Sequence, residues 1–496
     1  MKIYKYTLEI SVFVCGAIVM IFEIVWSRIL WPYFWTWIFV WTSLIGIILW
    51  SLSIGYYTGW KIADRNPNLE NLSLIILLSS ILIWCTLLIK DTLLVALQTN
   101  VTNIKISSIV ASVIIFSPAS ILLGMVSPYA AKLKINNLKN SWSTIGNLYS
   151  LSTAGSIIWT FLAGFYLIPQ FGTNKLLVIL SITLVSISIF ISSKKLTKFK
   201  VWTLILAICG LLFFSYKNIF IHKGNEFIDI DTAYNRIWIY NSIDIKTKKM
   251  VKVMWINNEN HSSMFLDSNE LVNEYTKYYH LAKHFNPDFK RTLMFGWAGY
   301  SYPKDFLLQY PEAKIDVIEI DPKITELAKK YFNVKDNPRL TIYHEDARVY
   351  LNKTKEKYDV LFWDAFTSHY SVPYQLTTQE AIKKEYNLLN DNWIVILNII
   401  SSIEWKKWEF LRGEYATYKS IFPQVYIFPV TEENNWNKVQ NIILIALKST
   451  KKQTFNSTDE TVNSYLQHLW KKPIDTDIPI LTDDYAPVDY YINKTM

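Results

Sequence analysis

Four neighbouring stretches decide the fold of this chain: residues 291–310 read RTLMFGWAGYSYPKDFLLQY, 315–332 read IDVIEIDPKITELAKKYF, 341–351 read TIYHEDARVYL and 357–366 read KYDVLFWDAF. Each stretch holds an apolar run that is short enough for a buried parallel strand. Helical patterns separate the runs. This alternation predicts a doubly wound α/β sheet of the Rossmann-like kind.

The expected strands include 292–295, 315–320 and 358–363, and the expected crossover helices are 302–310 and 323–331. Open α/β sheets bind their ligands outside the carboxyl ends of the strands. The residues that directly follow each apolar run are therefore the candidate site residues.

Glycines and acids follow these runs. Gly296 and Gly299 end the first strand, Glu319 ends the second, Asp346 follows the third and Asp364 ends the fourth. A glycine loop lets a ligand approach the backbone, and an acid at the end of the second strand suits a ribose diol. An acid after the third strand can accept a hydrogen bond from the amine of adenine. The pattern predicts a nucleoside pocket, although a strand-end acid can also simply cap the next turn.

The first part of the chain differs in composition from the rest. Of 496 residues, 51% are hydrophobic and 20 are Trp, and the excess lies before about residue 216. A length of about 20 apolar residues crosses a bilayer. The apolar runs predict seven membrane spans, roughly at 7–29, 35–58, 72–89, 107–128, 143–168, 174–193 and 201–219.

Charge and cysteine usage narrow the class of protein. The net charge is +9, but the lysines lie in loops without a nucleic-acid motif, so a membrane surface is the expected partner rather than nucleic acid. Cys15, Cys85 and Cys209 lie inside apolar runs, which indicates neither a disulfide framework nor a metal site.

Three parts are expected: a membrane domain at 1–220, a small β-rich part at 221–290 and a Rossmann-like core at 291–496. Residues 227–266 alternate in strand fashion, which predicts a small antiparallel sheet. The fold class is thus a multi-span α-helical membrane domain followed by an α/β methyltransferase-type domain. Two late strands should form a hairpin at its sheet edge.

The lysine bias of alternate loops predicts that the N-terminus lies in the cytoplasm. Seven spans would then place the second half outside, away from a nucleoside made in the cytosol. Either one of the seven spans does not cross the membrane, or the ligand is not such a nucleoside. In the first span, Glu9, Glu23 and Arg28 are candidate functional residues, but Glu23 and Arg28 can also pair structurally.

Seven pieces, taken in order along the chain, resemble the spermidine synthase (polyamine aminopropyltransferase) family: EIVWSRIL, AYNRIWIY, GWAGYSYPKDF, VIEIDP, EDARVYL, DAFTSHYSVPYQLTT and LTDDYAPV. The resemblance is greatest to bacterial members that carry a multi-span membrane half. It implies an enzyme that transfers an aminopropyl group from decarboxylated S-adenosylmethionine to an amine such as putrescine.

The resemblance also implies roles for individual residues. Glu319 would hold the ribose, Asp346 and Ala347 the adenine, and Asp364 the attacking amine with help from Tyr234. The remaining site residues would be Gly296 and Gly299 on the nucleoside and Asn235, Thr367 and Tyr302 on the substrate. No tightly bound cofactor and no metal are expected, because the sulfonium is already an activated leaving group. The expected partners are the amine, the cosubstrate, the lipid bilayer of the inner cell membrane and, as an open alternative, a second copy of the chain.

Three departures keep other functions open. Family members carry an acid in the glycine loop, where this chain has Trp297 and Ala298, and a second acid where it has Thr367; Asn235 replaces a usual glutamine. The alternatives are a non-catalytic polyamine- or nucleoside-binding protein, a transport-coupled membrane protein, or another S-adenosylmethionine-dependent transferase.

Overall fold

The computed structural model describes residues 6–34, 37–101, 103–135, 141–192, 198–221, 227–257, 259–364, 372–404, 408–431 and 436–493. The chain forms two compact units. The helical unit comprises Met1–Gly224 together with Asp229–Arg236, and the α/β unit comprises Asn225–Ile228 together with Ile237–Met496.

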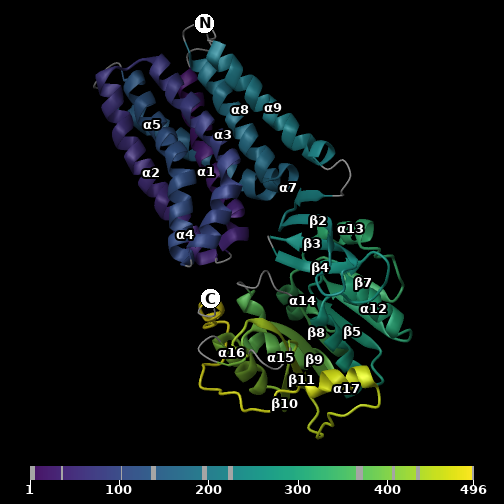
Figure 1. Ribbon diagram of the computed structural model, residues 1–496. Coiled ribbons are helices and arrows are strands. Elements are labelled where there is room, and N and C mark those ends of the chain that lie inside the picture. The colour runs from purple at the N-terminus through teal and green to yellow at the C-terminus, as the bar shows by residue number, and fades with distance from the viewer. Residues whose placement is uncertain are drawn as a thin grey trace. The chain divides into compact units, whose positions relative to one another are not determined.

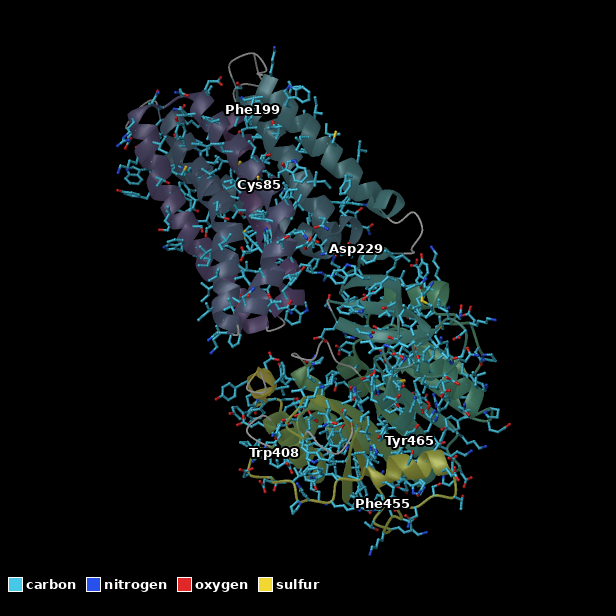
Figure 2. The ribbon with its side chains drawn as sticks, in the orientation of Figure 1. Cys85, Phe199, Asp229, Trp408, Phe455 and Tyr465 are labelled. Carbon is cyan, nitrogen blue, oxygen red and sulfur yellow. The ribbon has the colours of Figure 1, made fainter. Side chains whose placement is uncertain are left out.

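The helical unit is a bundle of helices, most of them long (Figure 1). They are α1 (Thr7–Phe34), α2 (Trp37–Arg65), α3 (Leu69–Asn100), α4 (Ile104–Ala111), α5 (Ser117–Lys134), α6 (Ser141–Leu162), α7 (Ile168–Phe171), α8 (Thr173–Ile191) and α9 (Lys198–Ile221). Short π turns, Ser112–Phe116 and Ala163–Leu167, join α4 to α5 and α6 to α7. The three cysteines are free thiols on α1, α3 and α9, and Cys85 is labelled in Figure 2.

Six segments of the described chain are long and apolar enough to cross a membrane: Thr7–Trp31, Phe39–Arg65, Leu69–Asn100, Lys105–Lys134, Ser141–Phe171 and Thr173–Ile191. They correspond to the first six expected spans. The seventh, 201–219, forms helix α9, several of whose side chains lie outside the described residues. Its crossing of a membrane therefore stays a prediction.

Two of the charged residues in the first span have structural partners. Glu9 forms an ion pair with Lys134 of α5. Arg28 donates hydrogen bonds to the carbonyl oxygens of Thr232, at 2.7 Å, and Ala233, at 3.0 Å. Both carbonyls belong to the segment Asp229–Arg236 of the same unit. The Arg28 guanidinium thus fixes the turn that leads into the first long strand of the small sheet.

The small sheet has four strands in sequential order: β1 (Ile228–Asp231), β2 (Arg236–Ile243), β3 (Met250–Ile256) and β4 (Glu259–Phe265). The β2–β3 and β3–β4 pairs are antiparallel. The alternating pattern of 227–266 thus gives the predicted antiparallel sheet.

The large sheet has seven strands in the order β10-β11-β9-β8-β5-β6-β7. Their bounds are β5 (Arg291–Phe295), β6 (Lys314–Ile318), β7 (Leu340–Tyr343), β8 (Tyr358–Trp363), β9 (Leu389–Ser401), β10 (Gln424–Pro429) and β11 (Gln440–Leu447). Strands β5 to β9 pair in parallel, and β11 pairs antiparallel with both β9 and β10. This confirms the predicted doubly wound sheet with a closing hairpin.

Helices connect these strands (Figure 1). They include α10 (Glu274–Lys277), α12 (Ser301–Gln309), α13 (Pro322–Tyr331), α14 (Ala347–Lys353), α15 (Gln379–Leu388), α16 (Glu409–Lys419) and α17 (Glu460–Gln467). The order of strands reverses at β5, which has β8 on one side and β6 on the other. Crevices at such a switch point are where open α/β sheets bind ligands.

Candidate functional site

The loop after β5 depends on its two glycines. Gly296 has φ of +71°, and its N–H donates to the carbonyl oxygen of Ile318 at 2.9 Å, which ties the loop to the end of β6. A Cβ on Gly299 would lie 2.3 Å from the Oγ of Ser262. Positive φ and close approach both favour glycine. The loop that the sequence assigned to a ligand is therefore built to approach its neighbours closely.

Glu319 lies directly after β6 and faces this loop. Its side chain is buried and accepts hydrogen bonds from the backbone N–H groups of Trp297, at 3.3 Å, and Asp321, at 3.0 Å. Burial raises the pKa of Glu319 to about 7, while these N–H donors act in the opposite direction. A carboxylate can accept about four hydrogen bonds, so two backbone donors leave capacity for a diol.

Asp346 has a structural contact of its own. It is the N-cap of α14, and its Oδ1 accepts from the N–H of Val349 at 2.9 Å. Ala347 is the first residue of that helix. The expected adenine position is therefore a helix start, where backbone N–H groups and one carboxylate oxygen are oriented by the cap.

Asp364 follows β8, next to the glycine loop across the parallel β5–β8 pair. Its N–H donates to the carbonyl oxygen of Phe295 at 3.0 Å. Its carboxylate accepts from the Tyr275 hydroxyl at 2.8 Å and from the Asn398 amide at 2.9 Å. The Asn398 oxygen accepts in turn from the Asn441 amide at 3.0 Å. This chain of contacts sets the orientation of the Asp364 carboxylate.

Tyr275 was not singled out from the sequence. It lies on the short helix α10 among several tyrosines of 274–279, and no local signal separates it from them. Burial and then the charge of Asp364 raise its pKa well above the usual range, so its hydroxyl stays protonated and remains a donor. The proximity of Tyr275 to Asp364 is a tertiary contact across 89 positions.

A cleft of about 1130 Å³ opens in the α/β unit at this point. Its walls come from β2 to β4, α10, the glycine loop, the ends of β8 and β9, the β10–β11 hairpin and α17. Asp364, Tyr275 and Asn398 line it together with Trp297 and Ala298 of the loop. The cleft therefore lies on the Asp364 side of the site, and the described residues that line it do not include Glu319 or Asp346.

The other predicted substrate-side residues are Tyr234, Asn235, Tyr302 and Thr367. Tyr234 is 48% exposed and, with Asn235, belongs to the turn that groups with the helical unit. Tyr302 is fully buried, with its ring centroid 5.0 Å from that of Tyr279, so it packs in the core of the α/β unit. Thr367 lies outside the described residues.

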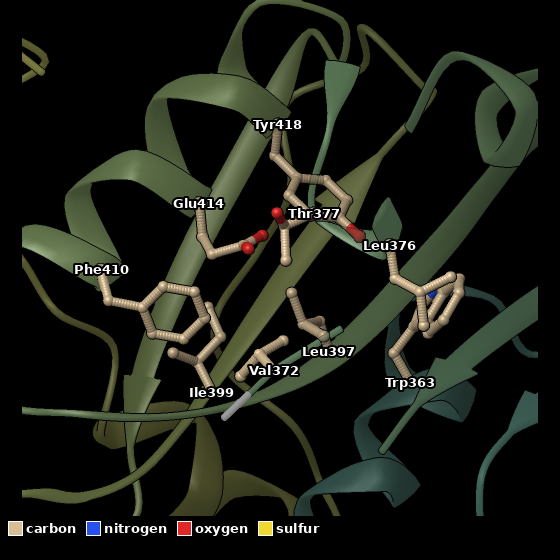
Figure 3. Close-up of a pocket in the computed structure, with 9 residues that line it drawn as sticks. All are labelled: Trp363, Val372, Leu376, Thr377, Leu397, Ile399, Phe410, Glu414 and Tyr418. Atoms are coloured by element: carbon tan, nitrogen blue, oxygen red, sulfur yellow. The ribbon is translucent and has the colours of Figure 1, made fainter. Parts of the chain in front are cut away.

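A second, enclosed cavity lies between β9, α16 and the start of the segment that begins at Val372 (Figure 3). Its volume of about 20 Å³ has room for roughly one water molecule. Glu414 and Tyr418 reach it from α16, and the Tyr418 hydroxyl donates to Glu385 at 2.9 Å. Burial raises the pKa of Glu385 to about 8 and that of Glu414 well above its usual range. These two acids belong to the core rather than to the cleft.

Comparisons with known proteins show what the α/β part of the chain is similar to. Residues 280–455 match the spermine/spermidine synthase domain. The chain is 31% identical over 186 residues to the polyamine aminopropyltransferase of Vibrio vulnificus (strain CMCP6), which covers 37% of this chain and 59% of that protein. It thus spans less than two thirds of that relative's length.

Two further similarities are weaker. The eEF1A lysine and N-terminal methyltransferase of Xenopus laevis is 25% identical over 152 residues, covering 29% of this chain and 21% of that protein. A crystal structure of a probable spermidine synthase from Corynebacterium glutamicum ATCC 13032 superposes with a TM-score of 0.42 at 20% identity, covering 48% of this chain and 86% of that one. Residues 280–455 are thus similar to spermine/spermidine synthase domains and to a polyamine aminopropyltransferase, and they are preceded, within the described residues, by six helices long and apolar enough to cross a membrane.

Proposed function

We propose that this chain is a membrane-bound aminopropyltransferase, which transfers the aminopropyl group of decarboxylated S-adenosylmethionine to an amine and releases methylthioadenosine. The observation that carries the proposal is the Asp364 carboxylate, held by Tyr275 and Asn398 at the wall of a large cleft beside the glycine loop. The homology to polyamine aminopropyltransferases supports the same reaction.

The reaction requires Asp364 to attract a cationic amine and to accept a proton from it. An ammonium has no lone pair, so a proton must leave before its nitrogen can attack the carbon next to the sulfonium. The carboxylate attracts the cationic amine and accepts that proton. The new C–N bond then forms as the C–S bond breaks, and the electron pair of that bond stays on sulfur. Hydrogen bonds from Tyr275 and Asn398 orient the Asp364 carboxylate.

The nucleoside is assigned to the other side of the site. In this proposal Glu319 binds the ribose hydroxyls, Asp346 and Ala347 lie at the adenine, and Gly296 and Gly299 let the cosubstrate approach the backbone. Tyr275, whose hydroxyl contacts Asp364, is a second candidate for the assisting role predicted for Tyr234. Roles for Tyr234, Asn235, Tyr302 and Thr367 stay predictions.

The missing loop acid is not replaced by the next acid in sequence. Asp305 is buried on α12 and lies 2.9 Å from the Nε2 of His280, away from the residues that line the cleft. In this proposal the glycine loop therefore supplies no acid to hold the aminopropyl amine of the cosubstrate.

The test uses the purified full-length protein in detergent or nanodiscs, with decarboxylated S-adenosylmethionine and a panel of amines. We expect release of methylthioadenosine that depends on the amine, measured by liquid chromatography. A parallel reaction with S-adenosylmethionine tests the alternative that the similarity to a methyltransferase raises: release of S-adenosylhomocysteine there, with no methylthioadenosine in the first reaction, would identify a methyltransferase. Binding of the nucleoside without either product would indicate a non-catalytic sensor or gate.

A further inference from the structure

The small sheet of β1 to β4 (Figure 1) ends in an exposed apolar patch. Ile243 pairs with Met250 across the antiparallel β2–β3 pair. The N–H of Leu266, directly after β4, donates to the carbonyl oxygen of Met250 at 3.1 Å. Residues opposite each other in a sheet point to the same face, so these three side chains form one row. They are 59%, 45% and 47% exposed, in the order Ile243, Met250 and Leu266, and Ile245 in the adjoining turn is 83% exposed.

The turn that joins β2 to β3 is ordered by its own hydrogen bonds. The N–H of Asp244 donates to the carbonyl oxygen of Lys249, and the N–H of Lys248 to that of Asp244, both at 2.9 Å. The Asp244 carboxylate accepts from the N–H and the hydroxyl of Thr247, both at 2.7 Å. Ile245 is therefore exposed on a turn that is held in one conformation.

Lysines surround the apolar row. Residues 243–252 contain four lysines and one acid, which are Lys246, Lys248, Lys249, Lys252 and Asp244. The first three of these lysines are exposed, and the Nζ of Lys249 lies 5.4 Å from the centroid of the Phe265 ring. The next acid is Asp267, which follows Leu266. Exposed apolar side chains among basic ones are typical of segments that lie in the headgroup region of an anionic bilayer.

Charge favours a lipid surface over a second copy of the chain. A two-fold interface brings the same patch of both copies together, so the lysines of one copy would face those of the other, and such like-charge contacts are unfavourable. Anionic headgroups complement the lysines instead. The chain also carries six segments that are long and apolar enough to cross a membrane, so a bilayer is available to it.

We propose that this surface is a docking site for a bilayer that contains anionic lipids. The docking patch consists of four apolar residues and three lysines, which are Ile243, Ile245, Met250, Leu266, Lys246, Lys248 and Lys249. Residues 242–246 also line the cleft beside Asp364, so docking would hold one wall of that cleft at the lipid surface. The inference rests on the membrane part of the proposed function and is independent of the reaction.

The test places a nitroxide spin label at Ile245→Cys of the full-length protein, in a background with Cys15→Ala, Cys85→Ala and Cys209→Ala. The protein is reconstituted into nanodiscs of phosphatidylcholine, or of phosphatidylcholine mixed with phosphatidylglycerol. Oxygen partitions into lipid and a nickel chelate stays in water, so the ratio of their relaxation effects reports what surrounds the label. We expect this ratio to be at least about threefold higher in the anionic discs, because apolar insertion and attraction of the lysines act together.

A second variant tests the charges. Lys246→Gln, Lys248→Gln and Lys249→Gln together should remove the difference between the two kinds of disc. Salt at about 0.5 M should do the same, because it screens exposed charges. The matched control is a label at Leu308→Cys, a residue of α12 that is 61% exposed and lies outside the docking patch, which should report water in both discs.

Three results would overturn the inference while leaving the proposed reaction intact. The label at Ile245→Cys could stay in water in both discs, or give the same ratio in both. Spin–spin coupling between labels at this position would place a second copy on the docking patch. A protein that does not stay with the nanodiscs at all would overturn the membrane part of the proposed function as well.

Discussion

The two proposed sides of the site, one for the nucleoside and one for the amine acceptor, hold their acids in different ways. On the nucleoside side, Glu319 accepts from the backbone N–H groups of Trp297 and Asp321, and Asp346 accepts from the N–H of Val349. On the acceptor side, the Asp364 carboxylate accepts from the side chains of Tyr275 and Asn398, which lie 89 and 34 positions away in sequence.

This difference indicates which side chains can be changed on each side without loss of the site. Backbone donors stay in place whatever the side chains are, so the nucleoside side depends on the path of the chain. The acceptor side depends on the identity of side chains from several elements, and substitutions there can change the amine that is accepted without changing the fold. Substitutions can therefore separate the two sides, or test the stability of the α/β unit that supports them.

The largest expected effect is at Asp364. Asp364→Asn keeps the size of the side chain but removes the negative charge and the proton acceptor. Loss of a general base typically lowers turnover by about 10²–10⁴-fold. Initial rates of methylthioadenosine release measure the effect, with Asp391→Asn, a 96% exposed acid, as the matched control. A rate within threefold of the parent would refute the role given to Asp364.

The next effect is at Glu319 and appears in nucleoside binding. Glu319→Gln should cost about 1.5–3 kcal/mol, the range for hydrogen bonds to charged groups, or roughly 10- to 150-fold in Kd for methylthioadenosine. Because the pKa of Glu319 is raised to about 7, protonation below that pH should weaken binding to the parent. Titrations between pH 5.5 and 8.5 should show this slope in the parent and not in the variant; the same slope in both would assign it to another group.

The same contrast between the two sides explains which features of the site could be predicted from the sequence. The strands were predictable because each is a short buried apolar run, and the predicted strand 358–363 is β8 (Tyr358–Trp363). Glu319, Asp346 and Asp364 became candidates because strand ends in an open α/β sheet meet at one edge, and their roles stay predictions. Their distance from one another in sequence did not matter, since the fold class alone brings them there.

The acceptor side could not be predicted in this way. The residues that line the cleft lie between Tyr240 and His468 in the sequence. A pattern within a short stretch of sequence carries no information about contacts between residues so far apart. No sequence pattern singles out Tyr275, whose hydroxyl donates to Asp364. Tyr302 follows the glycine loop in sequence, yet its ring turns into the core because the first turn of α12 packs there.

A smaller effect is expected in stability, from the buried acids Glu385 and Glu414. Burial raises the pKa of both above the unfolded value near 4.5, so the folded protein binds more protons than the unfolded chain between pH 4.5 and about 8. The free energy of unfolding therefore falls as pH rises through this window, by at most about 1.4 kcal/mol per pH unit for each acid.

Glu414→Gln removes one of these titrations and should flatten the fall. Thermal unfolding of the full-length protein in detergent, followed between pH 5 and 9, measures it. The matched control is Glu380→Gln, since Glu380 lies on α15 but not at the enclosed cavity. An identical pH dependence in the parent and in Glu414→Gln would show that the carboxyl does not titrate in this range.

The smallest effect is at Tyr275. Tyr275→Phe removes one hydrogen bond to Asp364, which is typically worth about 0.5–1.5 kcal/mol, and should lower kcat/KM about two- to tenfold. Because that bond favours the ionised carboxylate, its loss should also move the acidic limb of the pH–rate profile to higher pH. Tyr279→Phe, whose hydroxyl donates to the Trp363 carbonyl instead, should leave the limb in place.

One titration tests most directly whether the two sides have separate roles. Methylthioadenosine is titrated into full-length Asp364→Asn, and its binding is measured by calorimetry. Since we propose that Asp364 binds the amine and Glu319 the ribose, we expect a Kd within about threefold of the parent, although turnover of this variant should be strongly reduced. A loss of affinity as large as that of Glu319→Gln would contradict the account, because it would place Asp364 on the nucleoside.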